Sequence, residues 1–217
     1  MADIFHEVDE EVRRERLQKL WDTYGIYVIA LAVLIVAGIG AWRGYEYWQA
    51  KKAAAAGAAF ESALSLSEEG KHAEADAAFA KIAAEAPAGY RILARLRAAA
   101  ELAESKPADA VKAYDELAAD NSLGSTLQDL AAIRAGMLVL DTAPLADMQR
   151  RLAAVAEPGR SFRHNARELL ALSAWRNHDI AAARRYIDMI ANDGESPPGA
   201  RARAEVLAAL IAGSGKS

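Results

Sequence analysis

The longest apolar stretch of the chain runs from Tyr24 to Trp48, close to the N-terminus. Its inner part, residues 26–42, has no charged side chain and would form a helix roughly 26 Å long. A bilayer core is about 30 Å thick and accepts helices of about 17 to 25 residues. The pattern therefore predicts a transmembrane helix over residues 24–48. Aromatic residues, which favour the headgroup layers, stand at both ends: Tyr24, Tyr27, Trp42, Tyr45, Tyr47 and Trp48.

Two other interpretations of this run are a cleaved signal peptide and a buried core helix. A signal peptide has a short, positively charged leader, whereas residues 1–23 hold four basic and seven acidic side chains. The run Ala53–Ala55 resembles a cleavage site. We favour an uncleaved anchor. The basic residues near the run, four before it and three after it, favour a cytoplasmic N-terminus. A long domain that follows such a helix translocates largely regardless of its charge, so we expect the residues after about 50 to lie outside.

Beyond residue 50 the composition favours helix throughout. Alanine makes up about a quarter of the chain, mixed with Leu, Glu, Arg and Lys, and strand-like alternation is hard to find. Helix breakers divide this part into segments of about 12 to 20 residues. The predicted fold is all-α, a single N-terminal transmembrane helix followed by short antiparallel helices. The breakers lie at 69–70, 87–89, 106–107, 121–122, 143–144, 158–159, 177–179 and 197–199.

The helical part also contains an internal repeat. Three similar fragments, residues 68–79, 103–114 and 175–186, end in an aromatic residue. The aromatic positions are 35 and then 72 residues apart, which is close to one and two periods of 36. A further copy is therefore expected near residue 150, within residues 140–151.

A period of this length, built as helix–turn–helix, resembles the tetratricopeptide repeat (TPR). We predict a degenerate TPR solenoid of about four repeats plus a capping helix. In the third copy, Arg150 interrupts the aromatic column and Arg134 occupies a position expected to be small. The small residues of the second helices are Ala75, Ala110, Ala146 and Ala182, the aromatic positions are Phe79, Tyr114, Arg150 and Tyr186, and the helix ends are Pro87, Ser122, Pro158 and Gly194.

The TPR resemblance implies a concave groove lined by the first helix of each repeat. Such a groove accepts an extended peptide or a segment of a partner protein. In the apolar run, Gly40 and Gly44 form a G-x-x-x-G pattern, which permits close contact between membrane helices. The groove residues expected from the repeat are Phe60, Leu64, Arg95, Leu102, Gln128, His164 and Arg167.

Charge and chemistry argue against several functional classes. The net charge of −4 argues against nucleic acid as the main partner. Residues 51–130 carry a net charge of −4 and residues 131–217 carry +3, which suggests either ordinary solvated helix faces or a polarised surface. The terminal "GSGKS" lacks the first glycine of a phosphate-binding loop. Cysteine is absent and the four histidines are scattered, so we expect neither an enzyme nor a bound cofactor or metal.

The N-terminal segment "EVDEEVRRERLQKLWDTYG", followed by the apolar run and "GAWRGYEYW", resembles a bacterial family of membrane-anchored TPR proteins. That family includes the ancillary SecYEG translocon subunit (YfgM-like). The resemblance implies a single-pass anchor in the bacterial inner membrane and a periplasmic TPR domain. It also implies protein partners, namely the translocon, periplasmic chaperones or client polypeptides.

The sequence thus divides into a cytoplasmic leader (1–23), a transmembrane helix (24–48), a TPR-like domain (49–212) and a flexible tail (213–217). The expected function is that of a membrane-anchored scaffold that binds proteins at the periplasmic face. One alternative is an assembly factor for another envelope complex. Another is a regulatory adaptor with inverted topology, whose TPR domain faces the cytoplasm.

Overall fold

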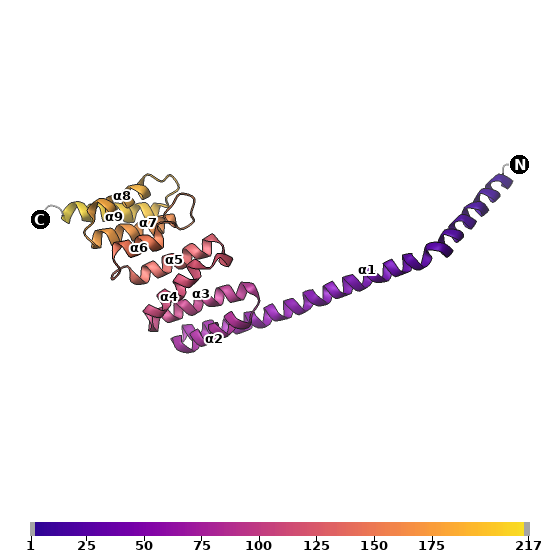
Figure 1. The fold of residues 1–217 in the computed structure, drawn as a ribbon, viewed down its shortest axis with the longest axis horizontal. Helices are drawn as coiled ribbons and strands as arrows, with labels where there is room; N and C mark the ends of the chain where they lie inside the picture. Colours follow the sequence, from indigo (N-terminus) through magenta and orange to yellow (C-terminus); the bar gives the residue numbers. More distant parts are fainter. Residues whose placement is uncertain (1–2, 215–217) are drawn as a thin grey trace. The chain divides into compact units, whose positions relative to one another are not determined.

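The computed structural model describes the backbone of residues 3–214 and the side chains of residues 14 and 18–213. Every regular element in this part is helical, so the predicted all-α class is confirmed (Figure 1). The elements are α1 (Asp3–Glu68), α2 (His72–Glu85), α3 (Ala88–Ser105), α4 (Pro107–Ala119), the short 3-10 helix η1 (Asn121–Leu123), α5 (Ser125–Val139), α6 (Leu145–Leu152), α7 (Arg163–Arg176), α8 (Ile180–Ala191) and α9 (Pro198–Ser214).

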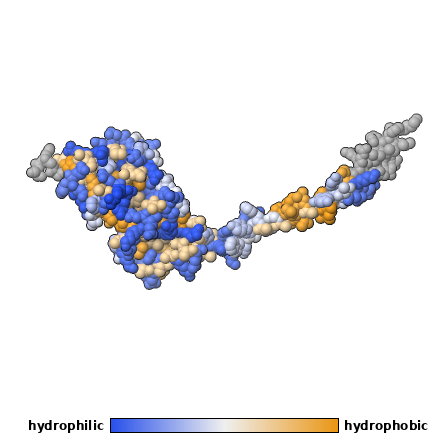
Figure 2. Space-filling view, in the orientation of Figure 1, coloured by the Kyte–Doolittle hydropathy of each residue, from blue (hydrophilic) through white to orange (hydrophobic). Residues whose placement is uncertain are grey.

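The apolar run lies within α1, and its side chains are not covered by other helices. All large apolar side chains given for residues 20–48 are 50–72% exposed, so this is not a core helix of the described fold. The run forms the apolar band on α1 in Figure 2. By length and composition α1 is the one described helix able to cross a membrane, although an N-terminal signal sequence would pass the same test.

The chain forms two compact units, residues 1–54 and residues 55–217. Helix α1 continues without a break through the predicted boundary at residues 48–49, and its last turns belong to the second unit. It ends where Gly70 adopts a φ of 76°, a left-handed conformation that glycine reaches without steric cost. The second unit then consists of four consecutive helix pairs, namely the end of α1 with α2, α3 with α4, α5 with α6 and α7 with α8, followed by α9.

The second helix of each pair, together with the turn that follows α6 in the third pair, places three side chains in the core with one constant spacing. A residue is followed by others four and seven positions later, which lie on one helical face. All twelve are at most 6% exposed. This confirms the predicted burial of Phe79 and Tyr114. The sets are Ala75, Phe79 and Ile82; Ala110, Tyr114 and Leu117; Met148, Leu152 and Val155; and Ala183, Ile187 and Ile190.

The third copy shows where the predicted register was wrong. Ala146 and Arg150 are exposed, and Met148 and Leu152, both 0% exposed, occupy the core positions instead. The reason is loop length, because the connection from α4 to α5 takes residues 120–124 whereas that from α2 to α3 takes only residues 86–87. The first core residues of the four sets are therefore 35, 38 and 35 positions apart.

The same shift in register explains why the predicted register placed Arg134 at a position in the first helix of the third copy that should hold a small residue. Gly136, not Arg134, stands at the small position, and it is buried. A Cβ atom at Gly136 would lie 3.1 Å from Cδ1 of Leu152. The absence of a side chain at Gly136 thus allows α5 and α6 to approach closely. In the fourth copy the predicted Ala182 and Tyr186 are buried, at 7% and 8% exposure.

The hydrophobic core of the repeat domain is divided along the chain into three clusters. The first joins the end of α1 to α2 and α3 around Phe79. The second joins α3, α4 and α5 around Tyr114 and Leu117. The third and largest extends from α5 to α9 around Leu152 and Leu170. This arrangement is expected of a solenoid, in which each repeat buries its apolar face mainly against its neighbours.

Arginine–carboxylate pairs connect segments of the repeat domain that lie far apart in the sequence. Arg151 donates to both carboxylate oxygens of Asp115, at 3.0 and 2.7 Å, and Arg160 donates to the buried Asp129. In both pairs the arginine comes from the positive half of the domain and the aspartate from the negative half. Part of the charge difference between the two halves is therefore neutralised within the fold.

Candidate partner-binding site

The predicted groove residues of the first repeat contribute to packing. Phe60 and Leu64 are half-buried against the first core cluster. The Phe60 ring lies 5.2 Å from that of Phe79, at an angle of 62°, and 6.0 Å from that of Tyr90. Such an edge-to-face arrangement stabilises the contact between helices. Phe60 thus joins α1 to α2 and α3.

The predicted groove residues of the second and third copies are more accessible. Arg95 keeps 38% of its side chain exposed while it donates to Asp120 at 2.6 Å. Hydrogen bonds from Ser122 and Arg95 lower the pKa of Asp120 to about 2. Leu102 is half-buried, and the Gln128 amide donates to Asn121 at 3.4 Å. Their role as partner contacts remains a prediction.

His164 and Arg167, by contrast, lie inside the domain at 7% and 3% exposure, and this corrects their placement on an open groove. Because the fourth copy lies one residue out of the predicted register, these positions belong to the packed face of α7. Arg167 donates to the carbonyl oxygens of Ala156 at 2.9 Å and Met189 at 3.0 Å. It also donates to Asp193 at 2.8 Å.

These buried groups form a charged cluster at the loop between α8 and α9. Arg163 donates to both oxygens of Asp193, at 2.8 and 3.3 Å, and its hydrogen bonds, with those from Arg167, lower the pKa of Asp193 well below its usual range. In the described part of the chain, neither ring nitrogen of His164 has a hydrogen-bond partner. Burial and the neighbouring Arg163 lower the pKa of His164. The cluster fixes the α8–α9 loop against α7.

These lowered pKa values predict a loss of stability in acid. An aspartate whose pKa is lowered on folding stabilises the native state above about pH 4, the pKa range of unfolded aspartate, and that stabilisation disappears as the pH falls through the folded pKa. For Asp120 and Asp193 the sensitive window is therefore about pH 4 down to 2 and below. We expect the melting temperature of residues 49–217, followed by circular dichroism, to fall in this window.

The variant Asp193→Asn should start from a lower melting temperature and show a smaller fall between pH 4 and 2. The matched control is Asp109→Asn, since the Asp109 side chain is exposed and its one partner among the described residues is the neighbouring Lys112 at 3.2 Å. If the melting temperature falls equally between pH 4 and 2 in the native domain and in Asp193→Asn, the lowered pKa of Asp193 does not contribute to the acid sensitivity.

The corrected repeat spacing leads to a groove between α7 and α9. Counting by 35, 38 and 35 residues, Arg95 is equivalent to Glu168 and Leu102 is equivalent to Trp175. Both equivalents line an open groove of about 350 Å³. The sequence analysis missed this groove, although the repeat spacing was a signal that could have found it. The lining residues are Glu168, Leu172, Trp175, Ala202, Arg203, Val206, Leu207 and Leu210.

The groove combines an apolar floor with one ion pair. Arg203 donates to both carboxylate oxygens of Glu168, at 2.5 and 2.8 Å. Val206 and Leu210 are 61% and 51% exposed, which is unusual for large apolar side chains of a folded domain that lie together. Trp175, half-buried beside them, is a residue type enriched at the energetic centres of protein interfaces. We therefore take this groove as the candidate partner-binding site.

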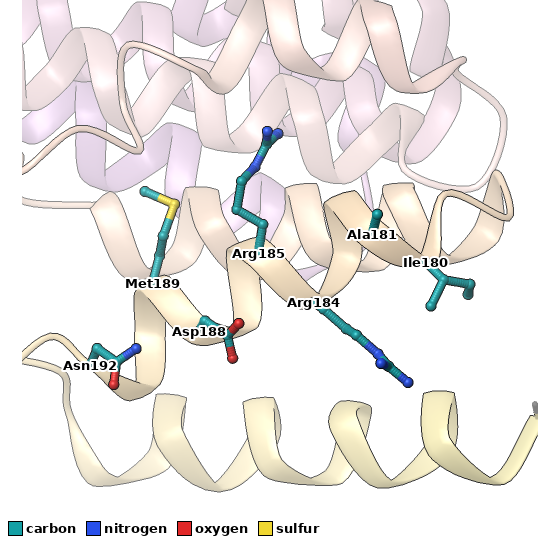
Figure 3. A pocket seen from close by; sticks show the side chains of 7 residues that line it. All are labelled: Ile180, Ala181, Arg184, Arg185, Asp188, Met189 and Asn192. Atoms are coloured by element: carbon teal, nitrogen blue, oxygen red, sulfur yellow. The ribbon is translucent and has the colours of Figure 1, made fainter.

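A second, larger depression of about 720 Å³ follows α8 (Figure 3). Arg184 and Arg185 line it and point in different directions from the helix. Among the described residues the Arg184 side chain has no hydrogen-bond or ion-pair partner, and the Arg185 guanidinium lies 5.0 Å from the Tyr186 ring centroid. Asp188 and Met189 also line this surface. This mixture of charged, polar and apolar side chains is typical of an ordinary solvated helix face.

Other predicted features are placed as follows. A Cβ atom at Gly40 or Gly44 would meet nothing within 4 Å, so both positions are open on α1, and their contact with another membrane helix remains a prediction. In the part of the chain whose side chains are described, no group of three or more His, Asp or Glu residues could hold a metal ion. Helix α9 extends through Ser214, and the rest of the predicted tail, residues 215–217, lies outside the described residues.

Comparison with known families gives one result. Residues 18–184, more than three quarters of the chain, match the family model described as tetratricopeptide repeat-like domain. The match includes the whole apolar run as well as the first helix pairs. No curated protein and no solved structure matches the chain significantly.

Proposed function

Because the chain belongs to the tetratricopeptide repeat-like family, a class of protein-interaction scaffolds, we propose that it is a membrane-anchored scaffold that holds protein partners at the periplasmic face of the bacterial inner membrane. The anchor is α1 through residues 24–48, with the N-terminus in the cytoplasm. The repeat domain binds its partners through the groove between α7 and α9.

One observation carries the proposal. The apolar run and the repeats lie in a single family match, so the apolar helix is part of the shared module, and a cleaved leader would remove a segment of that module. The exposure of the run also supports an anchor, since a helix with large apolar side chains on all sides needs a nonpolar environment. Aromatic residues at both ends suit the two headgroup layers.

The nature of the partners follows from the resemblance of the N-terminal segment to the YfgM-like translocon subunit. We propose partners in protein translocation across the inner membrane or among the periplasmic chaperones. The apolar groove suits exposed apolar segments of such proteins, because burial of apolar surface is the main favourable contribution to association.

Retention in the membrane is the first expected result. The full-length protein should stay in the membrane pellet after extraction with alkaline carbonate and should keep its N-terminal residues. Residues 49–217 alone should be soluble and helical by circular dichroism. Isolation of a mature protein that begins near residue 54 would contradict the anchor.

Topology and binding are tested separately. Alkaline phosphatase fused after residue 60 should be active, since this reporter works only outside the cytoplasm. A photo-crosslinking residue at Trp175 should give discrete protein adducts in membranes, and one at Leu93, an exposed side chain on α3, should not give the same adducts. An inactive fusion would favour the cytoplasm-facing adaptor.

A further inference from the structure

Helix α9 occupies the position of the first helix of a fifth repeat. It packs against α8 and α7, as α7 packs against α6 and α5. The register continues as well, because Leu207 and Leu210 stand 35 residues after Leu172 and Trp175. Ala200, Ala204, Leu207 and Ile211 form its buried face and are at most 5% exposed.

The outer face of α9 differs from the same face of the other first helices. Ala63 and Ala171 are 0% exposed, Gly136 is buried against Leu152 of α6, and Ala98, the equivalent residue of α3, is half-buried. The equivalent residue in α9, again 35 positions after Ala171, is Val206 at 61% exposure. No described helix covers it.

The last two turns of α9 are also unusual for the end of a solenoid. Residues 206–213 contain no polar or charged side chain. Terminal repeats normally present a polar outer face that keeps the solenoid soluble. An apolar terminal face instead continues the surface by which each repeat binds the next.

We infer that the outer face of α9, formed by Ala202, Val206, Ala209 and Leu210, docks one amphipathic helix of a partner protein, which takes the place of the second helix of a fifth repeat. This inference rests on the proposed scaffold function and specifies the partner of the same groove, since Ala202, Val206 and Leu210 also line it. The face continues an interface that recurs four times within the domain.

The repeats specify the chemistry of this helix. Helices α2, α4 and α8 each present a core residue followed by apolar residues four and seven positions later, as in Ala183, Ile187 and Ile190. In the third repeat the last of the three, Val155, lies in the turn just after α6. The docked helix should have the same face. An extended peptide fits less well, because it would bring unpaired backbone groups onto an apolar surface whose charged lining residues, Glu168 and Arg203, already bond to each other.

A peptide copy of residues 178–194, stapled into a helix on its solvent-facing side and carrying a fluorophore, is the probe. It should bind the full-length protein in lipid nanodiscs saturably, as measured by fluorescence anisotropy. The variants Val206→Asp and Leu210→Asp should each weaken binding at least tenfold. Met137→Asp is the matched control, because Met137 is 53% exposed on α5, away from α9, and it should leave binding unchanged.

Absence of peptide binding would overturn the inference. So would binding that survives Val206→Asp, since this would show that the peptide exchanges with α8 itself. Light scattering on the protein without peptide tests for self-association. If the protein self-associates and Val206→Asp abolishes this, the face binds a second copy of the chain. Binding of liposomes to the nanodisc-held protein, lost in the same variant, would assign it to a lipid surface. Carbonate extraction and the phosphatase fusion test the anchor and its topology and do not depend on α9. A failure of the proposed function would therefore appear in those two experiments, whereas a failure of this inference would appear only in peptide binding.

Discussion

Replacement of Leu152 by alanine should lower the free energy of unfolding of the repeat domain by about 3 kcal/mol, the usual cost of a cavity at a fully buried leucine. Leu152 is 0% exposed, and its methyl groups fill the space beside Gly136. The variant Arg150→Ala, two residues earlier, should cost less than about 0.5 kcal/mol. Its side chain is 75% exposed and pairs only with Asp147 on the same helix, and exposed pairs contribute little.

Urea denaturation of residues 49–217, followed by circular dichroism, measures both changes. Phe79→Ala serves as a reference, because Phe79 holds the equivalent position of the first repeat and is also 0% exposed. It should cost on the order of 3 kcal/mol. Similar losses at Arg150 and Leu152 would mean that the third repeat follows the even period predicted from the sequence and not the shifted one.

Replacement of Arg167 by methionine should destabilise the domain by about 3 kcal/mol. The change leaves the carbonyl oxygens of Ala156 and Met189 without this donor, and it removes one of the two arginines that neutralise Asp193. Removal of one partner from a buried ionic network typically costs this much, because the remaining groups stay desolvated. The denaturation midpoint in urea should therefore fall clearly.

Arg184→Met is the matched control. The Arg184 side chain lies on α8 and has no hydrogen-bond or ion-pair partner among the described residues, so its replacement should lower the stability of the domain by less than about 0.5 kcal/mol. Arg167→Lys should recover only part of the loss, since an ammonium group lacks the planar fork that reaches three acceptors. A stable Arg167→Glu variant would show that the side chain faces solvent, as the groove prediction required.

The helices, their pairing and much of the core could be predicted from the sequence because they depend on local patterns. Gly70 and Pro107 mark helix ends, and Phe79 and Tyr114 recur at a spacing that fits one period. The burial of these two aromatic residues required only the helical repeat and the rule that large apolar side chains fill the space between helices.

The third repeat could not be placed because its register depends on a loop. The sequence "DNSLG" at residues 120–124 is recognisable as a connection, but its length relative to other loops becomes visible only when both neighbouring helices are located. Arginine added a second difficulty. The burial of Arg167 depends on Asp193, 26 residues away, and no helical pattern distinguishes such an arginine from an exposed one.

The division of the core into three clusters has a consequence for how the domain opens. Few buried side chains connect the cluster around Phe79 to the large cluster that extends to α9, so the domain should open in parts and not all at once. Amide hydrogens of α2 and α3 should exchange with solvent before those of α7 and α8. The half that carries the α9 face would then remain folded while the half next to α1 opens transiently.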